Sequence, residues 1–95
     1  MDRRGAKRVI AAAGARGRAA VEFTTHALFE AMSDDGVSAC DVFHVLSNVD
    51  EILPQNDHGR RWKAYGPVVG GDRYAVVVLL LEGGRLRVIT THDLP

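Results

Sequence analysis

Apolar side chains recur every three to four residues in the first half of the chain, which is the period of a helix that buries one side. This pattern predicts three helices, over residues 5–14, 24–33 and 38–49. Thr24 and Ser38 are suited to cap the second and third helices, because their side-chain oxygens can accept hydrogen bonds from backbone N–H groups of the first turn.

The second half of the chain changes to β-branched and alternating sequences separated by glycine-rich turns. An antiparallel meander is expected over residues 60–92, with strands at 61–69, 73–81 and 85–91. A fourth strand near residues 51–55 is an open alternative. The sequence therefore predicts one α+β domain, in which the N-terminal helices pack on one face of a twisted antiparallel sheet of three to four strands.

Composition supports a folded domain over residues 1–95. Hydrophobic residues make up 46% and charged residues 25% of the chain, and this balance argues against intrinsic disorder. No apolar run is long enough to cross a membrane. The single Cys40 excludes an intrachain disulfide, and it fits a reducing compartment, so a cytoplasmic location is expected.

The formal net charge of zero hides an asymmetry along the chain. Residues 1–18 carry six basic side chains and one acidic side chain, a net charge of +5, and the remaining residues carry −5. A basic N-terminal helix or arm can attract a polyanion such as nucleic acid. A solvated helix without a partner explains the same charges, and both interpretations stay open here.

Cationic and aromatic side chains are concentrated in the predicted meander. They are Arg60, Arg61, Lys63, Tyr65, Arg73, Tyr74, Arg85, Arg87 and His92. Cations with exposed rings suit single-stranded RNA, because they contact phosphates and stack on bases. Alternatively, the charges only protect exposed strands from pairing with other chains. The four histidines lack the spacing of a helical zinc site, and we expect neither a metal ion nor another cofactor.

The order of the segments FTTHALFEAM, GVSACDVFHVL, GRRWKAYGPVVGGDRYAVVVLL and GRLRVITTHD resembles small bacterial toxin domains. The pattern is similar to the MqsR-like branch of the RelE superfamily and to an uncharacterised family beside it. The resemblance implies a RelE-like fold, metal-independent cleavage of messenger RNA, and a cognate antitoxin protein that blocks the toxin. The family's upstream functional lysine has no match in residues 50–58, and Ala31 stands where the uncharacterised family usually has arginine.

The resemblance also implies roles for single residues. Lys63 takes the place of a functional polar residue after the tryptophan, Tyr74 that of a functional tyrosine, and His92 that of a functional lysine. In the expected reaction the ribose 2′-OH attacks the adjacent phosphorus. His92 would transfer a proton, Tyr74 would donate a proton or position a group, and Lys63 would stabilise the phosphate. The residues expected to bind RNA are Arg60, Arg61, Tyr65, Arg73, Arg87 and His26.

These observations predict an endoribonuclease toxin of a toxin–antitoxin system, whose partners are messenger RNA or another single-stranded RNA and an antitoxin. The alternative is a non-catalytic protein-binding or nucleic-acid-binding module with the same fold. A homodimer is a further open alternative, because a domain of this size buries a modest share of its surface.

Overall fold

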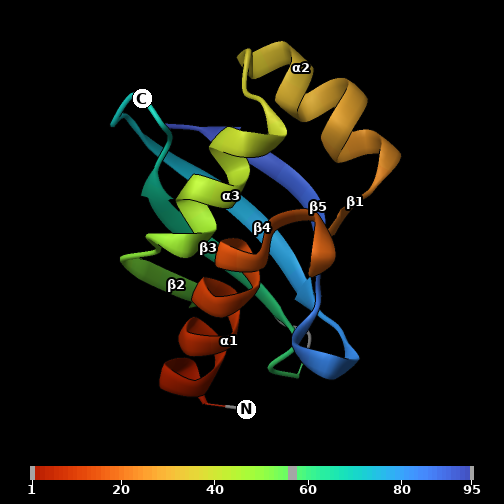
Figure 1. The fold of residues 1–95 in the computed structure, drawn as a ribbon, viewed down its shortest axis with the longest axis vertical. Coiled ribbons are helices and arrows are strands. Elements are labelled where there is room, and N and C mark those ends of the chain that lie inside the picture. Colours follow the sequence, from red (N-terminus) through yellow and green to blue (C-terminus); the bar gives the residue numbers. More distant parts are fainter. Residues whose placement is uncertain (1, 56–57, 95) are drawn as a thin grey trace.

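The computed structural model of the protein describes residues 2–55 and 58–94, and it has an α+β fold, as predicted (Figure 1). The elements follow in the order α1 (Arg3–Arg16), η1 (Gly17–Ala19), β1 (Val21–Phe23), η2 (Ala27–Ala31), α2 (Met32–Asp35), α3 (Ala39–Ser47), β2 (Glu51–Pro54), β3 (Arg61–Pro67), β4 (Arg73–Leu80), η3 (Glu82–Gly84) and β5 (Leu86–Asp93). The π-helical segment η2 continues into α2, and together they form the second predicted helix.

Within these described residues, the strands form one sheet of five strands in the order β1-β5-β4-β3-β2. The meander of β3, β4 and β5 and the fourth strand β2 are antiparallel, as expected. The prediction of an entirely antiparallel sheet of three to four strands is wrong, because β1 pairs with β5 in parallel. With only three residues, β1 is too short to show a recognisable alternation in the sequence.

The caps of the helices explain where they begin and end. The Thr24 hydroxyl accepts a hydrogen bond from the Ala27 N–H at 3.1 Å, and Ser38 forms a reciprocal capping box with Asp41. The first helix was expected to end near Gly14, but it continues to Arg16. A cap at Gly17, whose φ of 61° favours glycine, then ends it.

Gly14 has a packing role inside α1. A Cβ atom at Gly14 would lie 2.5 Å from the Ser47 nitrogen and 2.6 Å from the Leu46 Cβ. The backbone of α1 therefore approaches α3 more closely than any side chain allows. Gly14 is therefore required by the contact between α1 and α3, and it does not mark the end of a helix.

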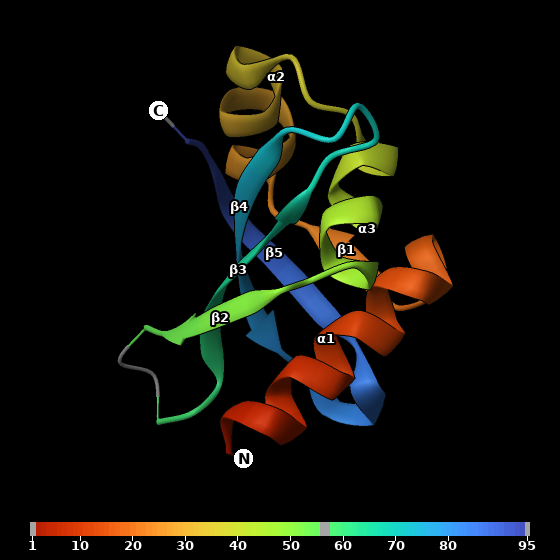
Figure 2. The same cartoon turned by 90° about the vertical axis from the view of Figure 1, so that its left-hand side faces the viewer.

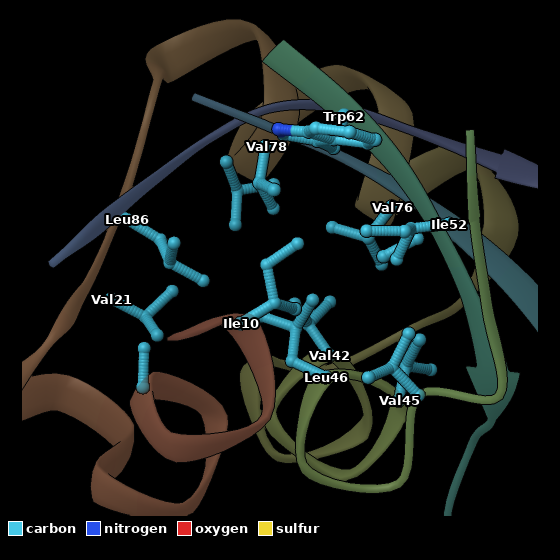
Figure 3. Packing of buried hydrophobic residues seen from close by; sticks show 14 of the residues in the cluster. Ile10, Val21, Val42, Val45, Leu46, Ile52, Trp62, Val76, Val78 and Leu86 are labelled. Carbon is cyan, nitrogen blue, oxygen red and sulfur yellow. The ribbon is translucent and has the colours of Figure 1, made fainter. Parts of the chain in front are cut away.

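The main core lies between the sheet and the two helices α1 and α3, which cover the same face of the sheet (Figure 2). Alternate residues of β3, Trp62 and Ala64, point toward the helices and are buried. Ile10 of α1 is 0% exposed and lies among core residues of α3 and the sheet (Figure 3). Burial of such a side chain contributes roughly 1.5–3 kcal/mol.

The opposite face of the sheet carries the residues that alternate with the core positions, and no helix of the described chain covers it (Figure 2). We call this surface the open face. It is formed by Arg61, Lys63, Tyr65, Ala75, Val77, Leu79, Arg87, Thr90 and His92. The meander thus displays Arg61, Tyr65 and Arg87, three of the six predicted RNA-binding residues, on one side of the molecule together with Lys63 and His92.

Candidate functional site

The structure does not bring the three expected catalytic side chains together. On β4 and β5, Ala75 is paired with His92, whereas Tyr74 is paired with Asp93. Because neighbouring residues of a strand point to opposite faces, Tyr74 and His92 lie on opposite sides of the sheet. His92 is exposed on the open face, and Tyr74 is 2% exposed within the core. The expectation that Tyr74 shares a site with His92 and Lys63 is therefore wrong.

Tyr74 is held in the core by two hydrogen bonds. Its hydroxyl oxygen lies 2.6 Å from Asp35 Oδ2 and 2.6 Å from Thr91 Oγ1. A phenol has a single proton, and the carboxylate is the stronger acceptor, so Tyr74 donates to Asp35 and receives a hydrogen bond from Thr91. Burial, and then the Asp35 carboxylate, raise the pKa of the Tyr74 phenol above its ordinary value. This pairing ties α2 to β4 and β5.

His26 lies beside the part of the open face that carries His92. One ring nitrogen of His26, Nε2, lies 3.2 Å from Thr90 Oγ1, and the other, Nδ1, pairs with Glu30 Oε2 at 2.5 Å. Thr90 and His92 are two residues apart on β5, so their side chains leave the same face about 7 Å apart. The structure thus places the imidazole of His26, the N-cap residue of η2, against Thr90, and that of His92 two residues further along the same face of β5.

Lys63 and Tyr65 lie across the sheet from this pair. Val77 of β4 pairs with both Lys63 and Thr90, and Ala75 pairs with both Tyr65 and His92. Residues two strands apart are separated by about 10 Å. The side chains on β4 between them are small and almost fully buried, with 0% exposure at Ala75 and 7% at Val77. Lys63 and Tyr65 thus face the two histidines across a row of short side chains.

The Tyr65 ring already has cationic neighbours. Lys63 Nζ lies 5.6 Å and Arg73 Cζ 4.9 Å from the centroid of the ring. Such contacts stabilise a cation over the ring face by about 0.5–1 kcal/mol at exposed sites. Tyr65 therefore holds Lys63, expected to be catalytic, and Arg73, expected to bind RNA, close together, in addition to offering its own ring.

Carboxylates of the same chain pair several of the predicted RNA-binding arginines. Arg73 lies 2.8 Å from Asp50 and 3.0 Å from Glu51, and these contacts raise the pKa of its guanidinium. On the other side of the open face, Arg85 and Arg87 both bind Glu22, at 2.7 and 2.9 Å. The hydrogen bond from Arg87 lowers the pKa of the Glu22 carboxyl most strongly. The phosphates of RNA must therefore compete with these carboxylates for the arginine side chains.

The remaining predicted residues lie at one end of the open face. Arg60 and Arg61 stand at the beginning of β3, where Arg60 is exposed and Arg61 is half-buried.

Sequence reasoning missed Glu30 and Thr90 as neighbours of His26. The four-residue spacing of His26 and Glu30 on a helix could have indicated their contact, whereas the contact with Thr90 depends on the fold.

Comparison of the chain with models of protein families found no match, and comparisons with curated proteins and with solved structures found none either. The resemblance to MqsR-like toxins therefore remains a prediction.

Among the residues that the structure describes, no group of three or more His, Cys, Asp or Glu side chains is arranged to hold a metal ion. In the same part of the chain, no helix has the length and apolar character that a membrane span needs.

Proposed function

We propose that this protein is a metal-independent endoribonuclease that binds single-stranded RNA on the open face of its sheet. The observation that carries the proposal is that His26, which contacts Thr90, and His92, two residues beyond Thr90 on β5, lie at the same face of the sheet, with Lys63 across it. Imidazole can act as acid or base near neutral pH, and cleavage next to a 2′-OH needs one group of each kind.

The reaction transfers two protons and needs no other reactant. One imidazole accepts the proton of the ribose 2′-OH as the O2′–P bond forms. The other, in its protonated form, gives a proton to the 5′-oxygen as the P–O5′ bond breaks. The products are a 2′,3′-cyclic phosphate and a 5′-hydroxyl end. Glu30 holds Nδ1 of His26, so Nε2 is the nitrogen that reaches the substrate, and it exchanges its contact with the Thr90 hydroxyl for the ribose or the 5′-oxygen. Lys63 stabilises the charge that develops on the phosphate.

Cleavage of single-stranded RNA in the presence of EDTA tests this proposal. His26→Ala and His92→Ala should each lower the rate by about 10²–10⁴-fold, because each removes one proton-transfer group. His58→Asn is the matched control. His58 is exposed outside the proposed site with a φ of 51°, a conformation that asparagine tolerates. Native rates in both histidine variants, or cyclic phosphate ends that form only with added metal, would overturn the proposal.

A non-catalytic binding module is the second candidate, and two observations favour it. The carboxylates of Glu22, Asp50 and Glu51 already neutralise arginines at the open face, and Tyr74 is buried in the core. This candidate predicts retention of RNA or of a protein partner without cleavage. The same incubation decides between the two, because intact RNA after prolonged exposure to purified protein excludes the nuclease.

The toxin role, the RelE-like fold and the antitoxin partner belong to this proposal through the resemblance alone. If they hold, expression of the chain arrests bacterial growth, and His92→Ala relieves the arrest while the protein accumulates to the same level. Co-expression of a neutralising protein encoded beside it would restore growth in the same way. A toxicity that His92→Ala leaves intact would separate the growth arrest from the proposed chemistry.

A further inference from the structure

A second cationic surface lies on α1 and η1, on the side of the sheet opposite to the open face (Figure 2). The buried residues of α1 are Ala6, Ile10, Ala13 and Gly14. Its exposed side carries Arg4, Arg8 and Arg16, which with Ala12 form one row of positions four residues apart. Arg3 precedes this row and Arg18 follows it, and both are exposed. We call these five residues the arginine surface.

The arginine surface is not neutralised by the rest of the described chain. The structure gives its five guanidinium groups no hydrogen-bond or ion-pair partner within residues 2–55 and 58–94, whereas Arg73, Arg85 and Arg87 each bind a carboxylate. The neighbouring Lys7 donates to the Asp50 carbonyl at 3.0 Å. The arginine side chains are thus available to an external anion without breaking contacts inside the molecule.

The arginine side chains on α1 lower the stability of the folded chain when no anion is bound. Like charges four residues apart on a helix repel each other by about 0.2–0.5 kcal/mol per pair. Arg3 and Arg4 lie in the first turn of α1, where the partial positive charge of the helix end disfavours a cation, although the Asp2 carboxylate caps the same end. A bound polyanion would reverse both unfavourable terms.

We infer that the arginine surface binds the phosphate backbone of a double-helical nucleic acid. Arginine matches phosphate oxygens with two parallel N–H donors, and five of the six cations in residues 1–18 are arginine. From Arg4 to Arg16 the row extends about 18 Å along the helix, because each residue rises 1.5 Å. A duplex carries one phosphate per strand for about every 3.4 Å, so the row can face several phosphates.

The exposed side of α1 does not fit other acidic partners equally well. A helix that lies in a membrane surface inserts large apolar side chains, but the uncharged exposed positions of α1 are Ala12 and Ala15. A protein partner needs a buried apolar centre in the interface. The apolar cavity lined by Val21, Phe23, Leu28 and Ala39 is bordered by Arg18 of this surface but not by Arg4, Arg8 or Arg16. Contacts with phosphates alone predict that duplex RNA and duplex DNA bind without sequence preference.

Fluorescence anisotropy with a labelled duplex of RNA, and with a duplex of DNA, tests the inference at several salt concentrations. The triple variant Arg4→Ala, Arg8→Ala, Arg16→Ala should weaken binding about tenfold or more and lower the log–log salt slope by roughly 2–3. Alanine favours a helix, and circular dichroism checks that the variant folds. The matched control removes three cations from the sheet by Arg73→Ala, Arg85→Ala and Arg87→Ala.

The outcomes separate this inference from the proposed nuclease. Duplex binding that survives in His26→Ala and His92→Ala but is lost in the α1 variant supports it, whether or not RNA is cleaved. An unchanged salt slope in the α1 variant, or an equal loss in the sheet control, would overturn it. Binding to vesicles that contain phosphatidylserine in the absence of duplex binding would assign the arginine surface to a membrane instead.

Discussion

Replacement of Tyr74 by phenylalanine separates a structural from a catalytic role of this residue. The change keeps the ring, which is 2% exposed, and removes the hydroxyl that binds Asp35 and Thr91. A hydrogen bond to a charged acceptor contributes about 1.5–3 kcal/mol, but Asp35 is only half-buried and can regain water. Thr91, at 4% exposure, would lose its phenol partner. We therefore expect a loss of about 1–2 kcal/mol in the free energy of unfolding.

Urea unfolding measures this loss directly. With a slope of about 1 kcal/mol per molar urea for a small domain, the midpoint should fall by about 1–2 M while the slope stays constant. Tyr65→Phe is the control, because in the described part of the chain the Tyr65 hydroxyl has no hydrogen-bond partner and the residue lies on the open face. RNA cleavage by the folded Tyr74 variant should match the wild type, because the ring lies on the other side of the sheet.

The pH dependence of stability gives a second test of the same residue. Burial and Asp35 raise the pKa of Tyr74 in the folded protein, whereas the unfolded chain titrates near pH 10. The stabilising contribution is therefore complete below about pH 10 and falls as the pH rises toward the folded pKa, by at most about 1.4 kcal/mol per pH unit. Tyr74→Phe should lack this alkaline loss. Impaired cleavage together with unchanged urea and alkaline stability would refute the structural role.

Three further predictions test the packing, a cap and the open face. Gly14→Ala should lower thermal stability by about 1–3 kcal/mol, since overpacking against Leu46 exceeds the gain in helix propensity, whereas Gly70→Ala should change little. Asp41→Ala should cost about 1 kcal/mol at pH 7 in urea unfolding. This cost should shrink below about pH 4, because hydrogen bonds from Ser38 and Val69 N–H groups hold the Asp41 pKa low. Glu22→Gln should tighten single-stranded RNA binding in anisotropy titrations by freeing Arg85 and Arg87.

The helices and the meander could be predicted because their signals are local. Thr24 and Ser38 cap the expected helices with side-chain oxygens, and the turns between β3, β4 and β5 follow the expected glycines. The parallel strand β1 could not be predicted, since a parallel pair joins segments far apart in the sequence and leaves no turn between them. Gly14 was misread because a glycine that ends a helix and a glycine that admits a neighbouring helix look the same in a sequence.

The face on which Tyr74 lies could not be predicted from β4 itself. The run from Ala75 to Leu81 is continuously apolar and shows no alternation, so it does not mark a core side and a solvent side. The strands beside it do alternate, with Trp62 and Ala64 buried on β3 and Lys63 and Tyr65 facing outward. Register then transfers this assignment to β4, because Gly66 pairs with Tyr74 and Tyr65 with Ala75. Prediction of a functional face on such a strand therefore needs the pairing partners of each residue, and a sequence supplies these only when the turn fixes the register.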